Sequence, residues 1–256
     1  MKSAVTEVGV DASVVPLELV TFEALDSKVQ QHTYHRQLHR TSVGPRTSRF
    51  HFEVGRTILQ RAEVEAQTAV DVLEAVLLLQ QALALHDEVA SESGVRRQLT
   101  VLAGDYCSGQ YYRLLARAGQ HALLTELSRA VMAVNEAKME LQNVVGAEST
   151  MSLRETIEGE LLYTLARHYL GRDGATHHQI QSMVRAHIVA TEMVKRRLPT
   201  YFTWRQAYDW LGDALDELLP LPANTLWAPI SSFLTEYLRP TQKYLEAQAY
   251  AEGNRG

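Results

Sequence analysis

The sequence predicts an all-α fold, a bundle of many helices. Apolar residues recur at the 3.6-residue period of an α-helix along most of the chain, and no convincing run alternates apolar and polar residues as a strand would. Capping-box patterns indicate helix starts at Ser152 to Glu155, Thr176 to Gln179 and Thr203 to Gln206. Helix ends are indicated at Gly119, Gly146, Gly171, Pro199 and Pro220. About eight to ten helices follow from these signals.

The N-terminal part contains a tail and a first helix. We expect residues 1–15 to form a loose tail, because Glu7 and Asp11 interrupt the apolar run that a secretion signal needs. Pro16 suits the first turn of a helix that runs to about Arg40, and residues 42–45 then break the chain. No linker is marked further along, so residues 16–256 are expected to form a single helical domain.

The most apolar stretch runs from Val70 to Leu85. It includes the polar residues Asp71, Glu74, Gln80 and Gln81. Because a transmembrane helix needs about 20 mostly apolar residues, this stretch is too short and too polar to be one. We therefore expect no transmembrane segment and place this helix at the centre of the core.

The helix predicted over residues 97–112 contains two glycines, Gly104 and Gly109. Each glycine in a helix interior costs roughly 1 kcal/mol relative to alanine. The small residues Ala103, Cys107 and Ser108 flank them and complete a flat strip. Such a strip lets a second helix, or a flat ligand, approach closely.

Composition excludes several classes of function. A net charge of -5 and a pI near 6.1 argue against a general nucleic-acid-binding surface. The single cysteine, Cys107, excludes an internal disulfide framework and fits a cytoplasmic protein. Peripheral attachment to the membrane stays open, although no anchor motif supports it. His32, His35 and His39 share a helical face, but arginines alternate with them and no carboxylate or thiolate completes the set, so we favour a solvated basic face over a metal site.

Three runs carry a resemblance to a known family. They are RQLTVLAGDY with SGQYY from Arg97, LHDEV from Leu85 and VNEAKM from Val134. Together they resemble component I of heptaprenyl diphosphate synthases, the small, non-catalytic subunit of two-component bacterial prenyltransferases. The resemblance implies the trans-prenyl diphosphate synthase fold, in which catalytic relatives hold Mg²⁺ on two aspartate-rich motifs to ionise an allylic diphosphate.

Both motifs are incomplete in this chain. At the first, catalytic relatives carry a run like His-Asp-Asp-x-x-Asp, whereas here Asp87 and Glu88 are followed by Ser91. Asp87, Glu88 and Glu92 could form a rephased acidic cluster, or they could be a solvated helix end. For the second motif the acidic candidates are Asp209, Asp213 and Asp216, which share one face of a helix in the pattern of an ordinary amphipathic surface helix.

The basic residues that bind diphosphate in catalytic relatives are also degraded. Their N-terminal basic run is reduced here to Pro45-Arg46-Thr47-Ser48-Arg49. At the place of a later lysine this chain has Glu158, a carboxylate that would repel a diphosphate. The fold is therefore expected to persist without the catalytic charges.

The resemblance implies a regulatory small subunit of a heterodimeric long-chain synthase, which makes heptaprenyl diphosphate from farnesyl and isopentenyl diphosphates for the menaquinone side chain. The partner, catalytic component II, would supply both motifs and the Mg²⁺, while this chain would bind no cofactor, complete the assembly and help set product length. We assign no catalytic residue. The candidates for the subunit interface or the prenyl tunnel are Leu102, Gly104, Asp105, Tyr106, Ser108, Tyr111 and Tyr112.

Two alternatives stay open. In one, the chain is a self-sufficient synthase that uses Asp87, Glu88 and Glu92. In the other, it is a helical adaptor without a prenyl substrate, whose thermal stability a prenyl diphosphate would leave unchanged.

Overall fold

The computed structural model describes residues 17, 20–36, 38, 47–194, 201–218 and 231–253. Over these residues the regular structure is helical and no strand is found, which confirms the all-α prediction. A short 3₁₀ turn, η2, spans Val89–Ser91. The α-helices are α1 (Phe22–Thr33), α3 (Arg49–Arg61), α4 (Ala66–Glu88), α5 (Gly94–Arg117), α6 (His121–Glu140), α7 (Ala147–Leu170), α8 (Gly174–Val194), α9 (Trp204–Leu218) and α10 (Ser231–Gly253).

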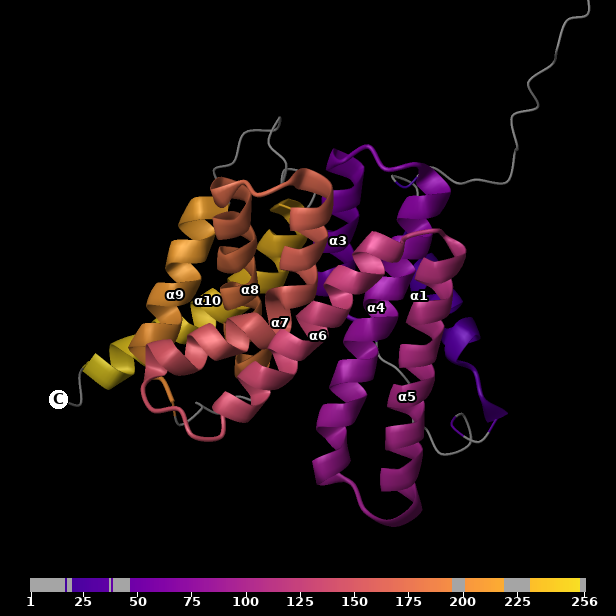
Figure 1. The fold of residues 1–256 in the computed structure, drawn as a ribbon. Coiled ribbons are helices and arrows are strands. Elements are labelled where there is room, and N and C mark those ends of the chain that lie inside the picture. The colour runs from indigo at the N-terminus through magenta and orange to yellow at the C-terminus, as the bar shows by residue number, and fades with distance from the viewer. Residues whose placement is uncertain are drawn as a thin grey trace, which may run out of the picture.

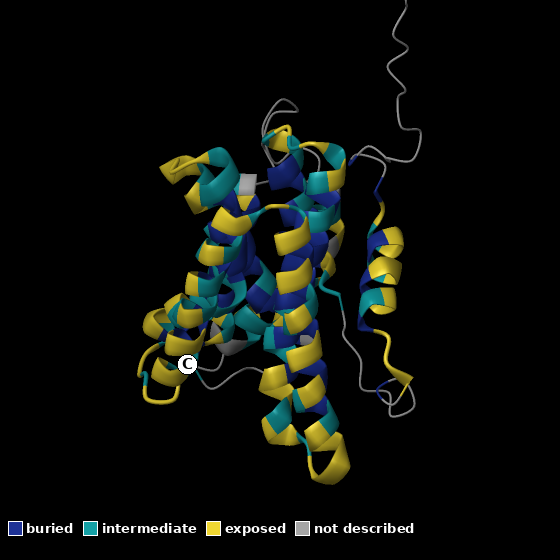
Figure 2. Ribbon diagram, turned by 45° about the vertical axis from the view of Figure 1, so that its right-hand side comes forward, coloured by how far each residue is buried: buried dark blue, intermediate teal, exposed yellow. Residues whose placement is uncertain are grey.

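The helices form two groups that meet around α6 and α7 (Figure 1). On one side, α4 and α5 pack along each other as a long antiparallel pair, with α1 beside them. On the other side, α8, α9 and α10 pack against one another, and α7 contacts both α6 and α8. The far end of the α4–α5 pair extends beyond the other helices and is largely exposed (Figure 2). The pair therefore presents a free outer surface on α5.

Helix α4 is the central helix of the core. Every residue from Val72 to Leu79 is at most 3% exposed, including Glu74, and this confirms the predicted buried helix. By length and composition alone, Ala66–Ser91 could also cross a membrane, but 72% of its most apolar window is buried inside the bundle. Its apolar character is thus explained by packing on nearly every side.

The predicted helix starts meet three different outcomes. The capping box at Thr203 is confirmed, because Thr203 Oγ1 accepts from Gln206 N at 3.1 Å and Gln206 Oε1 accepts from Thr203 N at 2.9 Å. The start at Thr176 is three residues late, since α8 begins at Gly174 and the carboxylate of Asp173, which precedes it, accepts from the amides of Ala175 and Thr176. The start at Ser152 is wrong: α7 begins at Ala147, so Ser152 lies inside the helix.

The predicted helix ends are partly confirmed. Gly119 and Gly171 follow α5 and α7 with φ of +68° and +83°, the left-handed conformation that favours glycine. Gly146 does not end α6, which stops at Glu140, but instead precedes α7. The predicted first helix is shorter than expected, because α1 covers Phe22–Thr33 and Thr21 caps its start. The tail, Pro16, residues 39–46, Pro199 and Pro220 lie outside the described residues.

Candidate functional site

The inner face of α5 packs against α4 through its small residues. A Cβ atom built on Gly104 would lie 2.8 Å from ring atoms of His86, so a larger residue here would have to displace the His86 ring. Ala103 and Cys107, each 1% exposed, pack with Leu85 in a small apolar cluster between the two helices. The predicted close approach of a second helix is therefore confirmed at Gly104.

The outer face of α5 has a different character. We define it by Val95, Leu102, Tyr106, Gly109 and Tyr112, all of which are exposed. Four of them are large apolar or aromatic side chains that are 39–69% exposed, and a Cβ built on Gly109 would meet nothing within 4 Å. Large exposed apolar side chains in a row are typical of a surface that binds another molecule. Gly109 thus has no packing partner within the described part of the chain.

The seven predicted interface or tunnel residues do not gather in one place, because they surround α5. Leu102, Tyr106 and Tyr112 belong to the outer face, whereas Gly104 and Tyr111 are buried. The two other residues differ from each other. Asp105 is exposed, with its Oδ1 atom 3.5 Å from His86 Nε2, and Ser108 is half-buried. The exposed side chains among the seven are therefore those of Leu102, Asp105, Tyr106 and Tyr112.

The three carboxylates at the end of α4 are not brought together. Asp87 Oδ1 accepts a hydrogen bond from Lys138 Nζ of α6 at 2.7 Å. Glu92 Oε1 instead pairs with Arg96 at 2.8 Å, and Glu88 is exposed. The predicted cluster requires a continuous α-helix that places Glu88 and Glu92 on one face. The 3₁₀ turn η2 lies between these two residues and interrupts that helix.

A charged cluster surrounds this lysine. We define it as Asp87, Lys138, Arg154, Glu158 and Glu192, from α4, α6, α7 and α8. Arg154 Nη1 donates to Glu192 Oε1 at 3.0 Å, which makes a second ion pair beside that of Asp87. Burial raises the pKa of Glu158, the negative charges of Asp87 and Glu192 add to this effect, and the two cations oppose it. Lys138 and Arg154 therefore pair with two carboxylates of the cluster, those of Asp87 and Glu192.

Sequence reasoning found only part of this cluster. Asp87 and Glu158 stand out as departures from catalytic relatives, and Lys138 lies within one of the runs that carry the resemblance. Arg154 and Glu192 have no signal of their own, because both look like ordinary charged residues of amphipathic helices. Their pairing follows from the packing of α7 on α8.

The other candidate ligands are also dispersed. Asp209 pairs with Arg205 at 3.0 Å, and Asp213 and Asp216 are exposed on α9. His32 Nε2 lies 3.0 Å from Glu74, and His39 lies outside the described residues. No group of three histidine, cysteine, aspartate or glutamate side chains that could hold a metal is found where the structure is described.

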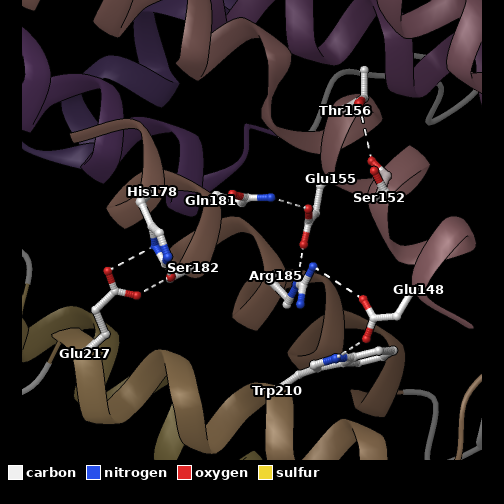
Figure 3. Close-up of polar contacts among 10 residues, drawn as sticks. All are labelled: Glu148, Ser152, Glu155, Thr156, His178, Gln181, Ser182, Arg185, Trp210 and Glu217. Carbon is white, nitrogen blue, oxygen red and sulfur yellow. Dashed lines mark hydrogen bonds and ion pairs between the residues drawn. The ribbon is translucent and has the colours of Figure 1, made fainter. Parts of the chain in front are cut away.

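A second polar network joins α7, α8 and α9 (Figure 3). Buried Glu155 accepts from Gln181 Nε2 at 2.8 Å and also pairs with Arg185. Trp210 Nε1 donates to Glu148 Oε1 at 3.0 Å, and the other oxygen of Glu148 lies 3.7 Å from Arg185. These contacts satisfy a buried carboxylate and hold three helices together, which is a structural role.

One corner of this network contains the residue types of a hydrolase triad. Ser182 Oγ lies 3.4 Å from His178 Nδ1, and Glu217 Oε1 lies 3.2 Å from the same nitrogen (Figure 3). In a triad, the serine and the carboxylate contact opposite nitrogens of the imidazole. Here both use Nδ1, and the serine hydroxyl donates to the carboxylate directly. This arrangement does not activate a nucleophile.

Residues 47–193, more than half of the chain, match the family described as heptaprenyl diphosphate synthase (HEPPP synthase) subunit 1. The chain belongs to this family. All five residues of the charged cluster and the whole of α5 lie within the matched range, and the resemblance carried by the three sequence runs is confirmed.

Two individual proteins are also similar to this chain. Heptaprenyl diphosphate synthase component 1 from Geobacillus stearothermophilus is 42% identical over 113 residues, which are 43% of this chain and 51% of that relative. The aligned part thus spans about half the length of the relative. A decaprenyl diphosphate synthase from Rhodobacter capsulatus shares the fold, with a TM-score of 0.59 and 13% identity over 86% of this chain and 95% of that one. The expected prenyl synthase fold is confirmed by this similarity.

Proposed function

We propose that this chain is the regulatory, non-catalytic subunit of a two-component long-chain trans-prenyl diphosphate synthase. Its partner, the catalytic component II, carries the aspartate-rich motifs and the Mg²⁺ and condenses farnesyl diphosphate with isopentenyl diphosphate. The product is heptaprenyl diphosphate for the menaquinone side chain, made in the cytoplasm. This chain completes the assembly and helps set the length of the product.

The ion pair between Asp87 and Lys138 is the observation that carries the proposal. An Mg²⁺ site that ionises a diphosphate needs carboxylate oxygens that are free to bind the metal. Here an ammonium group lies 2.7 Å from the Asp87 carboxylate, and Ser91 replaces the carboxylate of the third motif position. The ammonium group of Lys138 repels Mg²⁺ from the Asp87 carboxylate. Glu88 is then the one remaining carboxylate of the motif, where at least two are needed.

The outer face of α5 is the proposed docking surface for component II. Its side chains are large, apolar and exposed, the composition found at the centre of protein interfaces. Met132 and Met139 of α6 are also 62% and 66% exposed. Flexible methionines suit a surface that packs against another subunit.

Incorporation of labelled isopentenyl diphosphate onto farnesyl diphosphate with Mg²⁺ tests the proposal. The assay compares this chain alone, the large subunit from the same genome alone, and the two mixed. We expect no turnover by this chain and long-chain product only in the mixture. Turnover by this chain alone, abolished by Asp87→Ala, would establish a self-sufficient synthase. Silence in the mixture, with the large subunit shown to be folded, would favour the adaptor.

A further inference from the structure

One side of α5, which lies at an edge of the bundle, carries a stripe of exposed residues (Figure 1). We call it the α5 stripe, and at 100° per residue its members all lie within about 60° of Gly109 around the helix. They are Leu102, Asp105, Tyr106, Gly109, Tyr112, Arg113 and Ala116, and each of them is exposed. A stripe of this shape suits a second helix laid along α5.

The residues of the stripe are matched in size about Gly109. Tyr106 and Tyr112 lie three positions to either side of it, and both are aromatic. Seven positions away, the large Leu102 on one side corresponds to the small Ala116 on the other. In an antiparallel pair of α5 helices that cross at Gly109, residues equally far from the crossing face each other. Each leucine then packs over an alanine, and the glycines let the two backbones approach closely.

The charges of the stripe select this antiparallel orientation. Asp105 and Arg113 lie four positions to either side of Gly109, so an antiparallel pair brings each aspartate to the arginine of the second copy. A parallel pair in the same register would place like charges together, which is destabilising. The Asp105 side chain is 65% exposed and is thus open to a second cation besides His86.

Helix α1 borders the stripe and holds two of its side chains in place. His32 Nδ1 lies 3.2 Å from Arg113 Nη2, and a guanidinium group has further N–H donors for a second acceptor. Just after α1, the ring of His35 lies 6.5 Å from the ring of Tyr106, centre to centre. Side chains that are already ordered lose less conformational entropy on association.

We propose that the isolated chain forms a symmetric dimer through antiparallel contact of two α5 stripes, with its two-fold axis at Gly109. A two-fold contact needs a surface that complements itself, and this stripe does so in both size and charge. Each contact occurs twice, so two ion pairs between Asp105 and Arg113 flank the crossing. Leu102 and Tyr106, which are 58% and 39% exposed in the single chain, lose water in the dimer.

The same side of α5 is the proposed docking surface for component II. The second copy and component II therefore compete for it, and the dimer covers the apolar side chains until component II replaces it. Dissociation of the dimer is then a step of assembly. This competition rests on the proposed function, whereas the dimer of the isolated chain does not.

Sedimentation equilibrium of the full chain tests the dimer over a concentration series that spans the micromolar range. We expect the wild type to shift from monomer to dimer as the concentration rises. Asp105→Arg and Arg113→Asp each create two contacts between like charges and should raise the dissociation constant at least about tenfold. A wild type that stays monomeric throughout the series, or variants that dimerise as tightly as wild type, would overturn the proposal.

A mixture of the two single variants tests the register. In a mixed antiparallel dimer, one contact joins the two substituted positions and the other joins the two unsubstituted ones, so both contacts pair opposite charges. The mixture should therefore dimerise nearly as tightly as wild type, although neither variant does so alone. A mixture that dimerises no better than its components would contradict the pairing of Asp105 with Arg113.

Two matched controls make the same charge changes elsewhere. Asp216→Arg on α9 and Arg172→Asp between α7 and α8 are at exposed positions and should leave the dissociation constant unchanged. Ala116→Arg replaces a charge variant that loses helical circular dichroism, because it adds bulk opposite Leu102 without removing a buried contact. It should also prevent dimerisation, and an unchanged dissociation constant for this variant would likewise overturn the dimer.

Adding the large subunit to the wild-type dimer tests the competition separately. We expect the dimer to disappear as a complex of the two subunits forms. A dimer that persists beside the large subunit would contradict docking of component II on α5, and it would leave the dimer itself in place. A chain that is monomeric alone yet binds the large subunit would have the opposite meaning.

Discussion

The two faces of α5 differ sharply in how far their side chains are buried. The inner face carries Gly104 and Tyr111, which are buried against the rest of the chain. The outer face carries Leu102, Tyr106 and Gly109, which are exposed although two of them are large and apolar. The inner face is explained by the fold of this chain. Packing among the described residues does not account for the exposed side chains of the outer face, and these side chains form the proposed docking surface.

The adjacent residues Tyr111 and Tyr112 of α5 should differ most in their effect on stability. Tyr111 is 1% exposed within the main core, so Tyr111→Ala should lower the free energy of unfolding by about 3–5 kcal/mol. Tyr112 is 47% exposed, and Tyr112→Ala should cost less than about 1 kcal/mol. Urea unfolding of both variants measures the difference. Equal losses would show that the two faces are not distinct in energy.

Substitutions on the outer face, which should affect stability little, should have the larger effect on binding to component II. The double variant Leu102→Asp with Tyr106→Asp places two charges on the outer face and should weaken the complex by about 2 kcal/mol or more, or ~30-fold. Titrating this chain against a fixed amount of large subunit, with synthase activity as the readout, measures the shift. Tyr250→Asp is the matched control, because Tyr250 is 75% exposed on α10. A similar shift for the control would argue against docking on α5.

The two glycines give the smallest but most specific test. Gly109→Ala should stabilise the isolated chain by about 0.5–1 kcal/mol, because alanine favours a helix and nothing lies within 4 Å of the new methyl group. Gly104→Ala should stabilise the chain less than Gly109→Ala does, since its methyl group meets the His86 ring at 2.8 Å and has to displace it. Thermal unfolding measures both changes.

The same glycine variants sharpen the comparison in the complex. If a helix of component II approaches α5 closely at Gly109, then Gly109→Ala stabilises the free chain yet weakens the assembly. Gly104→Ala should leave the affinity for component II unchanged, because its methyl group would point into this chain. A gain in both stability and affinity for Gly109→Ala would place the contact elsewhere on the outer face.

Local signals in the sequence predicted the helices well. The buried helix α4 follows from its dense apolar run, and the start of α9 follows from Thr203 and Gln206, which satisfy each other's backbone amides. The start of α7 was misplaced because Ser152 and Glu155 match a capping box, whereas the helix already begins at Ala147 after Gly146. A capping pattern cannot reveal whether the residues before it are helical too.

The candidate site was predictable only in part, because its contacts link residues far apart in the chain. Lys138 and Asp87 are 51 positions apart, and neither residue type specifies the other. The seven candidate residues on α5 differ among themselves in a way that the sequence does show. At 100° per residue they cannot share one face, so helical periodicity already separates Tyr106 from Tyr111. The structure shows that Tyr106 is the exposed residue of the two and Tyr111 the buried one.

The ion pair of Asp87 with Lys138 also bears on how this protein can evolve. A single change at Ser91 to aspartate would add a carboxylate, but on the 3₁₀ turn and beside a resident ammonium group. Restoring a metal site requires the loss of Lys138 and a continuous helix as well, and neither change helps alone. Under the proposed function, a return to independent catalysis would therefore need several changes at once, and the chain depends on its partner for activity.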